Sequence, residues 1–282
     1  MIKEKLFIFF IKIIVFTVIL IITGIFGYLL YKGFSVLSFD FIFSMPRNFM
    51  KEGGILPAIV GTFLLVFISI IIALPFGLAT AIYLSEYKSK GFLVDLIKIS
   101  INTLSGVPSV VFGLFGYGIF VNLFGFGISA ISGGLTLAIL SLPIIISSTL
   151  EALSAVPQSY REASMALGAT KWETIQKVVL PSATPSILTA IILSIARVSG
   201  ETAPILFTAC VFYQPKLSFS LFSPVMALPY HIYALISEGT EPNIHIPMAW
   251  GTAVVLLALI IFLSLFAMIY REKRRRYDKI RV

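Results

Sequence analysis

Two oppositely charged side chains lie inside an otherwise apolar stretch of the C-terminal half. In SIARVSGETAPILFTA, Arg197 and Glu201 are four residues apart, so a continuous helix would place them on one face. An arginine at mid-bilayer costs about 2.5 to 3.5 kcal/mol even on insertion scales, and such a residue indicates a functional site. Its forked guanidinium suits an oxyanion, although the pair could also serve packing alone. Gly200 and Pro204 would loosen this helix and expose backbone groups along a pathway.

A second group of residues with distinctive spacing lies in a more polar segment upstream. From Gln158 the sequence reads QSYREASMALGATKWETIQKVVLP. Its periodicity predicts two short helices joined at Gly168, where a left-handed or close-packed backbone is needed, with the second helix ending at Leu180-Pro181. The apolar stripes are Tyr160, Ala163 and Leu167 in the first helix, and Trp172, Ile175 and Val179 in the second. Taken alone, the segment fits an amphipathic loop that lies on a membrane surface.

Other reactive side chains give little support for an enzyme or a metal site. The ingredients of an intramembrane enzyme would be Ser105, Ser109 and Glu201. Neither histidine, His231 nor His245, lies in an apolar stretch where it could act as a base, and two histidines are too few for a metal centre. Cys210 is the only cysteine, which excludes an internal disulfide and any multi-cysteine metal site. We therefore expect neither enzyme activity nor a cofactor.

The composition is that of an integral membrane protein. Of the 282 residues, 58% are hydrophobic and 12% are charged, and the mean hydropathy is +1.01. A soluble domain carries about 25% charged residues. The apolar residues form long runs instead of alternating, so the spans are helices and not barrel strands. The net charge of +8 gathers in loops and in the C-terminal tail, which argues against a nucleic-acid partner.

Six apolar windows are long enough to cross a bilayer, which takes about 20 residues. They are residues 6–31, 55–84, 92–121, 128–150, 182–212 and 248–270. The first far exceeds the apolar core of a cleavable signal peptide, so we interpret it as a retained helix. The tail after Tyr270 holds seven basic residues, whereas the predicted outer segments hold only Lys32, Arg47, Lys51 and Lys216. This asymmetry predicts a multi-pass protein with both termini in the cytoplasm, and a tail that binds anionic lipid.

Two connections are long enough to hold structure of their own. The inner loop, residues 151–180, mixes charged and apolar residues. The outer loop, residues 213–247, contains five prolines, and proline at this density predicts an irregular connection without another helix.

The inner loop resembles the EAA loop of ABC importer permeases. The family pattern is EAA, three residues, Gly, nine residues, Ile, one residue, Leu-Pro. Here it is matched by Glu162-Ala163-Ser164, Gly168, Val178 and Leu180-Pro181, with Ser in place of the third residue and Val in place of Ile. In that family the loop docks into a separate ATPase. The chain has no G-x-x-x-x-G-K-[ST] phosphate loop of its own, so the energy would come from a partner.

Three further strings make the chain similar to the PstA-type permeases of phosphate-specific ABC importers. They are GVPSVVFGLFG from Gly106, ARVSGETAPILFTA from Ala196, and ALPYHIY from Ala227. Gly106, Pro108, Gly113 and Gly116 in the first string would kink its helix or permit tight packing. The resemblance extends from about Gly54 to the last span.

The resemblance implies an all-α fold of six transmembrane helices, the type I ABC importer permease fold. Residues 1–54 would form the first helix and an external loop, and residues 55–282 the permease core with its cytoplasmic coupling loop 151–181. Its partners would be a second homologous permease subunit in a heterodimer, two copies of an ATPase, an external phosphate-binding protein, and membrane lipid. The resemblance also implies that Arg197 and Glu201 line the substrate path. It places Glu162, Ala163, Gly168, Leu180 and Pro181 at the ATPase contact, in a bacterial or archaeal plasma membrane.

The chemistry of Arg197 leaves other oxyanions open. Sulfate or molybdate would satisfy an arginine equally well, and phosphonate is a further candidate. Sulfate and molybdate carry no proton at neutral pH, whereas phosphate has a P–OH group whose hydrogen a carboxylate at Glu201 could accept. A permease for another oxyanion, or a sensor that does not transport, therefore remain the alternatives.

Overall fold

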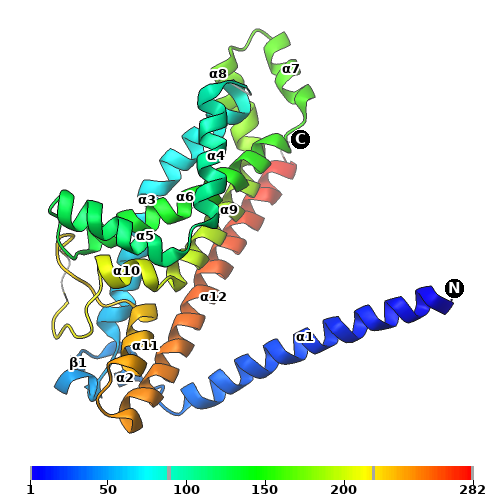
Figure 1. The fold of residues 1–282 in the computed structure, drawn as a ribbon. Coiled ribbons are helices and arrows are strands. Elements are labelled where there is room, and N and C mark those ends of the chain that lie inside the picture. Colours follow the sequence, from blue (N-terminus) through cyan, green and yellow to red (C-terminus); the bar gives the residue numbers. More distant parts are fainter. Residues whose placement is uncertain (1, 88–89, 218–219, 281–282) are drawn as a thin grey trace.

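The computed structural model describes residues 2–87, 90–217 and 220–280 (Figure 1). Four long helices form its centre: α3 (Leu56–Ile82), α6 (Ala130–Ser154), α9 (Leu180–Gly200) and α12 (Pro242–Ile280). Within the described residues, five helices are long and apolar enough to cross a membrane, and a bent pair makes a sixth candidate. The predicted all-α membrane fold is therefore confirmed.

Glycines bring α3 and α6 into close contact. A Cβ built at Gly134 would lie 2.3 Å from Cγ2 of Ile68, and one at Gly77 would lie 2.5 Å from Cγ2 of Ile145. Small residues at such contacts allow helix backbones to approach where no hydrophobic effect drives them together. These two helices therefore form a tightly packed pair at the centre of the bundle.

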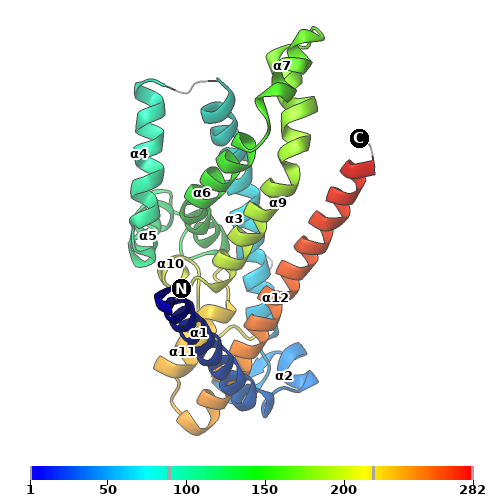
Figure 2. The ribbon, with the colours of Figure 1, turned by 90° about the vertical axis from the view of Figure 1, so that its right-hand side faces the viewer.

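Helix α1 (Ile2–Phe34) projects sideways away from the bundle in Figure 1 and points toward the viewer in Figure 2. Its contact with α12 lies near its C-terminal end, where Tyr28 packs edge-on against Trp250 with ring centroids 5.6 Å apart. None of the most apolar window of this helix is buried. An apolar surface of this extent suits lipid or another subunit.

The predicted third span, 92–121, is not one straight helix. It consists of α4 (Phe92–Gly106), α5 (Ser109–Gly116) and the π-helical turn η3 (Tyr117–Leu123), with a bend of 109°. Pro108 has no N–H to donate and restricts the preceding residue, and Val107 accordingly adopts an extended backbone (φ −73°, ψ 130°). Figure 2 shows α4 upright beside the bundle, with α5 turned aside at its base.

The predicted fifth span, 182–212, is also interrupted. Helix α9 ends at Gly200, and the short helix α10 covers Ala203–Thr208. Pro204 occupies the first turn of α10, where a missing N–H costs nothing. The expected loosening at Gly200 and Pro204 is therefore a complete break.

The prediction of an irregular outer loop without a helix is wrong. Helix α11 (Leu228–Ser237) lies within it, and α12 already begins at Pro242. Pro229 stands in the first turn of α11, and Pro242 is the first residue of α12. Both prolines therefore begin helices instead of preventing them. The same end of the molecule holds α2 (Phe39–Phe43), β1 (Pro46–Arg47), η1 (Asn48–Met50) and β2 (Glu52–Gly53). The two strands pair antiparallel, with Pro46 opposite Gly53.

The opposite end holds the inner loop and the C-terminal end of α12 (Figures 1 and 2). The loop contains α7 (Gln158–Ala166), α8 (Lys171–Thr174) and the π-helical turn η4 (Ile175–Val179), and a similar turn, η2 (Tyr83–Tyr87), ends α3. The predicted end of the second loop helix at Leu180-Pro181 is wrong, because helix continues from Lys171 to Gly200. The N–H of Leu180 reaches back five residues to the carbonyl of Ile175 in η4. Such a π-turn accommodates the proline that follows it.

Candidate functional site

The two helix breaks have the same local geometry. Val107 and Glu201 both follow the last residue of a helix, both have φ −73° and ψ 130°, and both donate their N–H to the carbonyl three residues earlier at 3.3 Å. The half-helices that follow, α5 and α10, pack on each other. A Cβ at Gly113 would lie only 2.8 Å from the carbonyl oxygen of Ala203. Glycine at position 113 therefore brings together two segments that are about 90 residues apart in the sequence.

Arg197 and Glu201 meet at the second break. Nε of Arg197 lies 3.4 Å from Oε1 of Glu201. Glu201 is the first residue beyond α9, so the two do not share a continuous helix as predicted, but they remain a pair. The arginine side chain is 51% exposed and the glutamate 16%. One long contact leaves most of the guanidinium donors available for another ligand.

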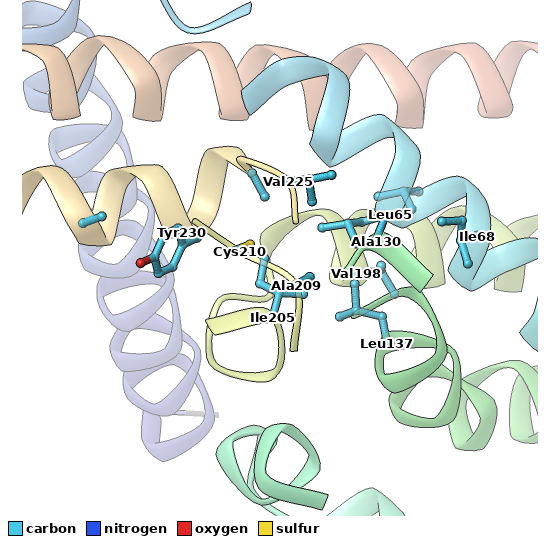
Figure 3. Close-up of a cluster of buried hydrophobic side chains, with 13 residues drawn as sticks. Leu65, Ile68, Ala130, Leu137, Val198, Ile205, Ala209, Cys210, Val225 and Tyr230 are labelled. Carbon is cyan, nitrogen blue, oxygen red and sulfur yellow. The ribbon is translucent and has the colours of Figure 1, made fainter. Parts of the chain in front are cut away.

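The hydrophobic core fixes the backbone on both sides of the Arg197–Glu201 pair. Val198 of α9 and Ile205 of α10 are buried in one hydrophobic cluster with Leu65 of α3 and Leu137 of α6 (Figure 3). The two residues anchor the chain on both sides of the break. Arg197 therefore projects from a fixed base on the face of α9 that points away from this core.

The same face of α9 continues toward the inner loop. Leu193, Thr189 and Ser186 precede Arg197 at helical spacing, and together with Ser148 of α6 they border a hollow of about 320 Å³. Nη1 of Arg271 donates a hydrogen bond of 2.9 Å to Oγ1 of Thr189. These hydroxyl side chains were not among the predicted site residues, although steps of three and four residues back from Arg197 place Thr189 and Ser186 on the same helix face.

The inner loop is a compact unit with a tight turn. Gly168 has φ +87°, as predicted for a left-handed residue, and a Cβ there would have no neighbour within 4 Å. Its N–H bonds to the carbonyl of Met165, and the N–H of Ala169 bonds to that of Ser164, which is the Schellman arrangement of a helix end. Thr170 and Glu173 then cap α8 reciprocally.

The departure from the family pattern at Ser164 has a structural reason. Its hydroxyl lies 2.9 Å from Oγ1 of Thr174, so it joins α7 to α8 by a hydrogen bond that alanine could not make. Glu162 and Ala163 on α7 are exposed, and Leu167 is 90% exposed. Together with the exposed Tyr160, the loop borders a second hollow, of about 620 Å³. An exposed apolar surface around a hollow indicates a contact with another protein.

Leu180 and Pro181 are placed differently from the rest of the loop pattern. Leu180 is half-buried against a cluster that includes Val179 and Leu153, and Pro181 is exposed at the start of α9. These two residues join the loop to the spanning helix. Helices α7 and α8 lie at one end of the molecule, well away from α10, which follows the helix break (Figure 1).

The remaining candidates for chemistry do not form a site. Ser105 donates its hydroxyl hydrogen to the carbonyl of Ile101 in its own helix. His231 of α11 and His245 in the first turns of α12 are both buried, and burial lowers the pKa of His231 to about 3, which keeps it neutral. The part of the chain that the structure describes contains no cluster of three or more histidine, cysteine, aspartate or glutamate residues that could hold a metal ion.

Comparisons with known proteins agree on one class of protein. A family model described as "binding-protein-dependent transport system inner membrane component" matches residues 73–276. The phosphate transport system permease protein PstA of Mycobacterium leprae is 39% identical over 246 residues, covering 85% of this chain and 79% of that protein. A probable PstA of Methanocaldococcus jannaschii is 36% identical, with 94% and 92% covered. The probable ABC transporter permease YqgI of Bacillus subtilis is 35% identical, with 86% of each chain covered.

Solved structures confirm the fold. A chain of a bacterial ABC transporter that imports alginate superposes with a TM-score of 0.68 at 15% identity, covering 95% of both chains. A chain of the MetNI methionine ABC transporter, in an inward-facing conformation, gives 0.61 at 17% identity, covering 84% of this chain and 99% of that one.

Proposed function

The chain belongs to the family of inner membrane components of binding-protein-dependent transport systems, and we propose that it is the permease subunit of an importer for inorganic phosphate. A separate ATPase would drive the transport. The observation that carries the proposal is the half-exposed Arg197, held at a helix break in a chain that resembles phosphate permeases over most of its length. A guanidinium at this helix break offers positive charge and forked hydrogen-bond donors to a tetrahedral oxyanion that has moved out of bulk water.

Glu201 supports phosphate over sulfate and molybdate, which carry no proton at neutral pH. Phosphate at neutral pH carries at least one P–OH donor, which a carboxylate accepts, whereas the same carboxylate repels an anion without a proton. Because Glu201 lies 3.4 Å from Arg197, one bound phosphate could meet both side chains. A permease for sulfate, molybdate or phosphonate is the runner-up, since Arg197 alone would serve those anions equally well.

The exposed apolar surfaces of this subunit support partners within the membrane. Arg197 lies on a face of α9 that the chain itself leaves half-open, which suits a path formed between two subunits. We propose a heterodimer with a related permease, together with two ATPase copies and an external phosphate-binding protein. One similar structure is that of a bacterial alginate ABC transporter in complex with a periplasmic protein that holds an alginate pentasaccharide.

The inner loop is the proposed contact with the ATPase. Ala163 and Gly168 are exposed at the hollow beside α7 and α8, and Glu162 is exposed on α7 next to Ala163, so a partner surface could reach all three. Leu180 and Pro181 would instead transmit the movement, because the second loop helix continues through them into α9. Force applied to the loop would then act directly on the helix that carries Arg197.

Uptake into lipid vesicles tests which anion the complex transports. The chain, co-purified with its permease partner and ATPase, is reconstituted with the binding protein, and uptake of labelled phosphate and labelled sulfate is compared. We expect ATP-dependent uptake of phosphate that excess sulfate does not compete away. Sulfate uptake at an equal rate would favour the runner-up, and ATP hydrolysis without uptake of any oxyanion would contradict both.

Accessibility of single cysteines tests the orientation. We propose that the inner loop and the tail are cytoplasmic and that the outer loop is external. In a variant whose Cys210 is replaced by serine, a cysteine at the exposed Thr240 should react with an impermeant thiol reagent in intact cells. A cysteine at the exposed Ala166 should react only after permeabilisation. The opposite result would invert the topology; Ser218, another outer position, lies outside the described residues.

A further inference from the structure

One buried ion pair joins the inner loop to the spanning helices. Arg161 of α7 donates to both carboxylate oxygens of Glu86 in η2: its Nη2 lies 2.7 Å from Oε1 and its Nε lies 3.1 Å from Oε2. The two side chains are only 12% and 7% exposed. A forked, two-point pair of this kind fixes orientation as well as distance.

The same guanidinium also reaches the end of α6. Its Nη1 donates to the carbonyl of Val156 at 2.8 Å, and its Nη2 donates to the carbonyl of Leu153 at 3.0 Å. These carbonyls belong to the last turn of α6 and to the residue just after its cap, where the regular helical pattern of N–H donors ends. The carbonyl of Leu153 also accepts the N–H of Val156 at 3.2 Å, so Arg161 adds a further donor there. Arg161 therefore links α7 to the ends of both α3 and α6, which are the tightly packed central pair.

Helix α7 has little else to hold it to the spanning helices. None of its nine residues, all of which the structure describes, is buried. In the described part of the chain, the side-chain hydrogen bonds from α7 to the spanning helices all come from Arg161, while Ser164 bonds within the loop. Lys171 of α8 lies 5.2 Å from the ring centroid of Tyr87, a weaker and exposed contact with η2. The orientation of α7 therefore depends on the ion pair.

We propose that the Glu86–Arg161 pair is a positioning element that transmits movement between the inner loop and the α3–α6 core. The proposal rests on the proposed coupling role of the loop. An ATPase that displaces α7 would pull on the ends of α3 and α6 through this rigid link, and on α9 through α8 and η4. With both connections in place, a movement of the loop would displace α3, α6 and α9 together. With the connection to α9 alone, α7 could change its orientation without moving α3 and α6.

Variants of Arg161 in the reconstituted complex test this proposal. Arg161→Ala and Glu86→Gln should lower the amount of phosphate taken up per ATP hydrolysed by about tenfold, within the usual range of coupling between sites, while the ATPase rate persists. Arg161→Lys keeps the charge but loses the fork, so we expect an intermediate ratio. Lys51→Ala is the matched control, because it removes an exposed ion pair, with Glu241, that lies outside the inner loop; its ratio should stay unchanged.

Hydrogen exchange gives a second measurement that does not depend on transport. In the assembled complex with Arg161→Ala, amides of α7 should exchange faster than in the wild type, while those of α9 should not. Unchanged exchange in α7, or a normal uptake ratio with Arg161→Ala, would overturn the proposal. If the wild type moves no phosphate but α7 still loosens, the proposed function fails and the ion pair keeps its positioning role.

Discussion

Replacing Arg197 and Glu201 together by alanine should leave an assembled complex that hydrolyses ATP but takes up little phosphate. A hydrogen-bonded charged partner contributes about 1.5 to 3 kcal/mol, so we expect transport to fall roughly ten- to hundredfold. If the pair served packing alone, the double variant would recover most of what either single change loses, because it leaves no unpaired ion in the membrane. The 51% exposure of Arg197 and its single contact of 3.4 Å favour the first outcome.

The measurement is uptake of labelled phosphate by the reconstituted complex, with assembly checked by co-purification of the ATPase. Arg197→Lys is the graded control, since it keeps the charge without the planar fork and should retain partial uptake. Glu201→Gln keeps the shape of the side chain and should weaken the preference for phosphate over sulfate more than it lowers the rate. Recovery of phosphate uptake in the double alanine variant would leave Arg197 as a structural partner of Glu201.

Gly168→Asp should uncouple ATP hydrolysis from transport while the protein still reaches the membrane. Two effects add at this position. A residue with a side chain at φ +87° costs about 1 to 2 kcal/mol, and the new carboxylate would project from the exposed turn toward the proposed ATPase contact. A Cβ at Gly168 meets nothing within 4 Å, so the start of the new side chain has room within the chain.

Gly168→Ala separates these two effects. Alanine has the unfavourable left-handed backbone but no carboxylate that projects toward the ATPase. We therefore expect a small loss of uptake with alanine and a loss of about tenfold or more with aspartate. ATPase activity and phosphate uptake are measured on the same vesicles, at equal expression. Normal uptake with Gly168→Asp would contradict the assignment of this loop to the ATPase contact.

Features that depend on a few neighbouring residues were predictable from the sequence. The left-handed turn at Gly168 follows from backbone geometry that glycine allows locally, and so do the interruptions near Pro108 and Gly200, although the sequence predicted only a kink and a loosening where the helices end completely. The spans follow from hydropathy, because a bilayer requires a long apolar run whatever the neighbouring helices are. The predictions at Pro181 and Pro229 were wrong. The helix continues through Pro181 after a π-turn, and Pro229 stands in the first turn of a helix.

Contacts between distant segments could not be read in this way. Nothing near Arg161 indicates that its partner is Glu86, 75 residues earlier, because the pairing exists only once α3 and α6 have packed and their ends lie together. The packing of α5 on α10 at Gly113, and the half-open position of Arg197, likewise depend on how the broken helices fold back on the core. Sequence alone determined which residue types stand at the site and where the chain must bend. Their distances and exposure required the packed bundle, since burial and ion pairing are properties of surfaces that meet in three dimensions.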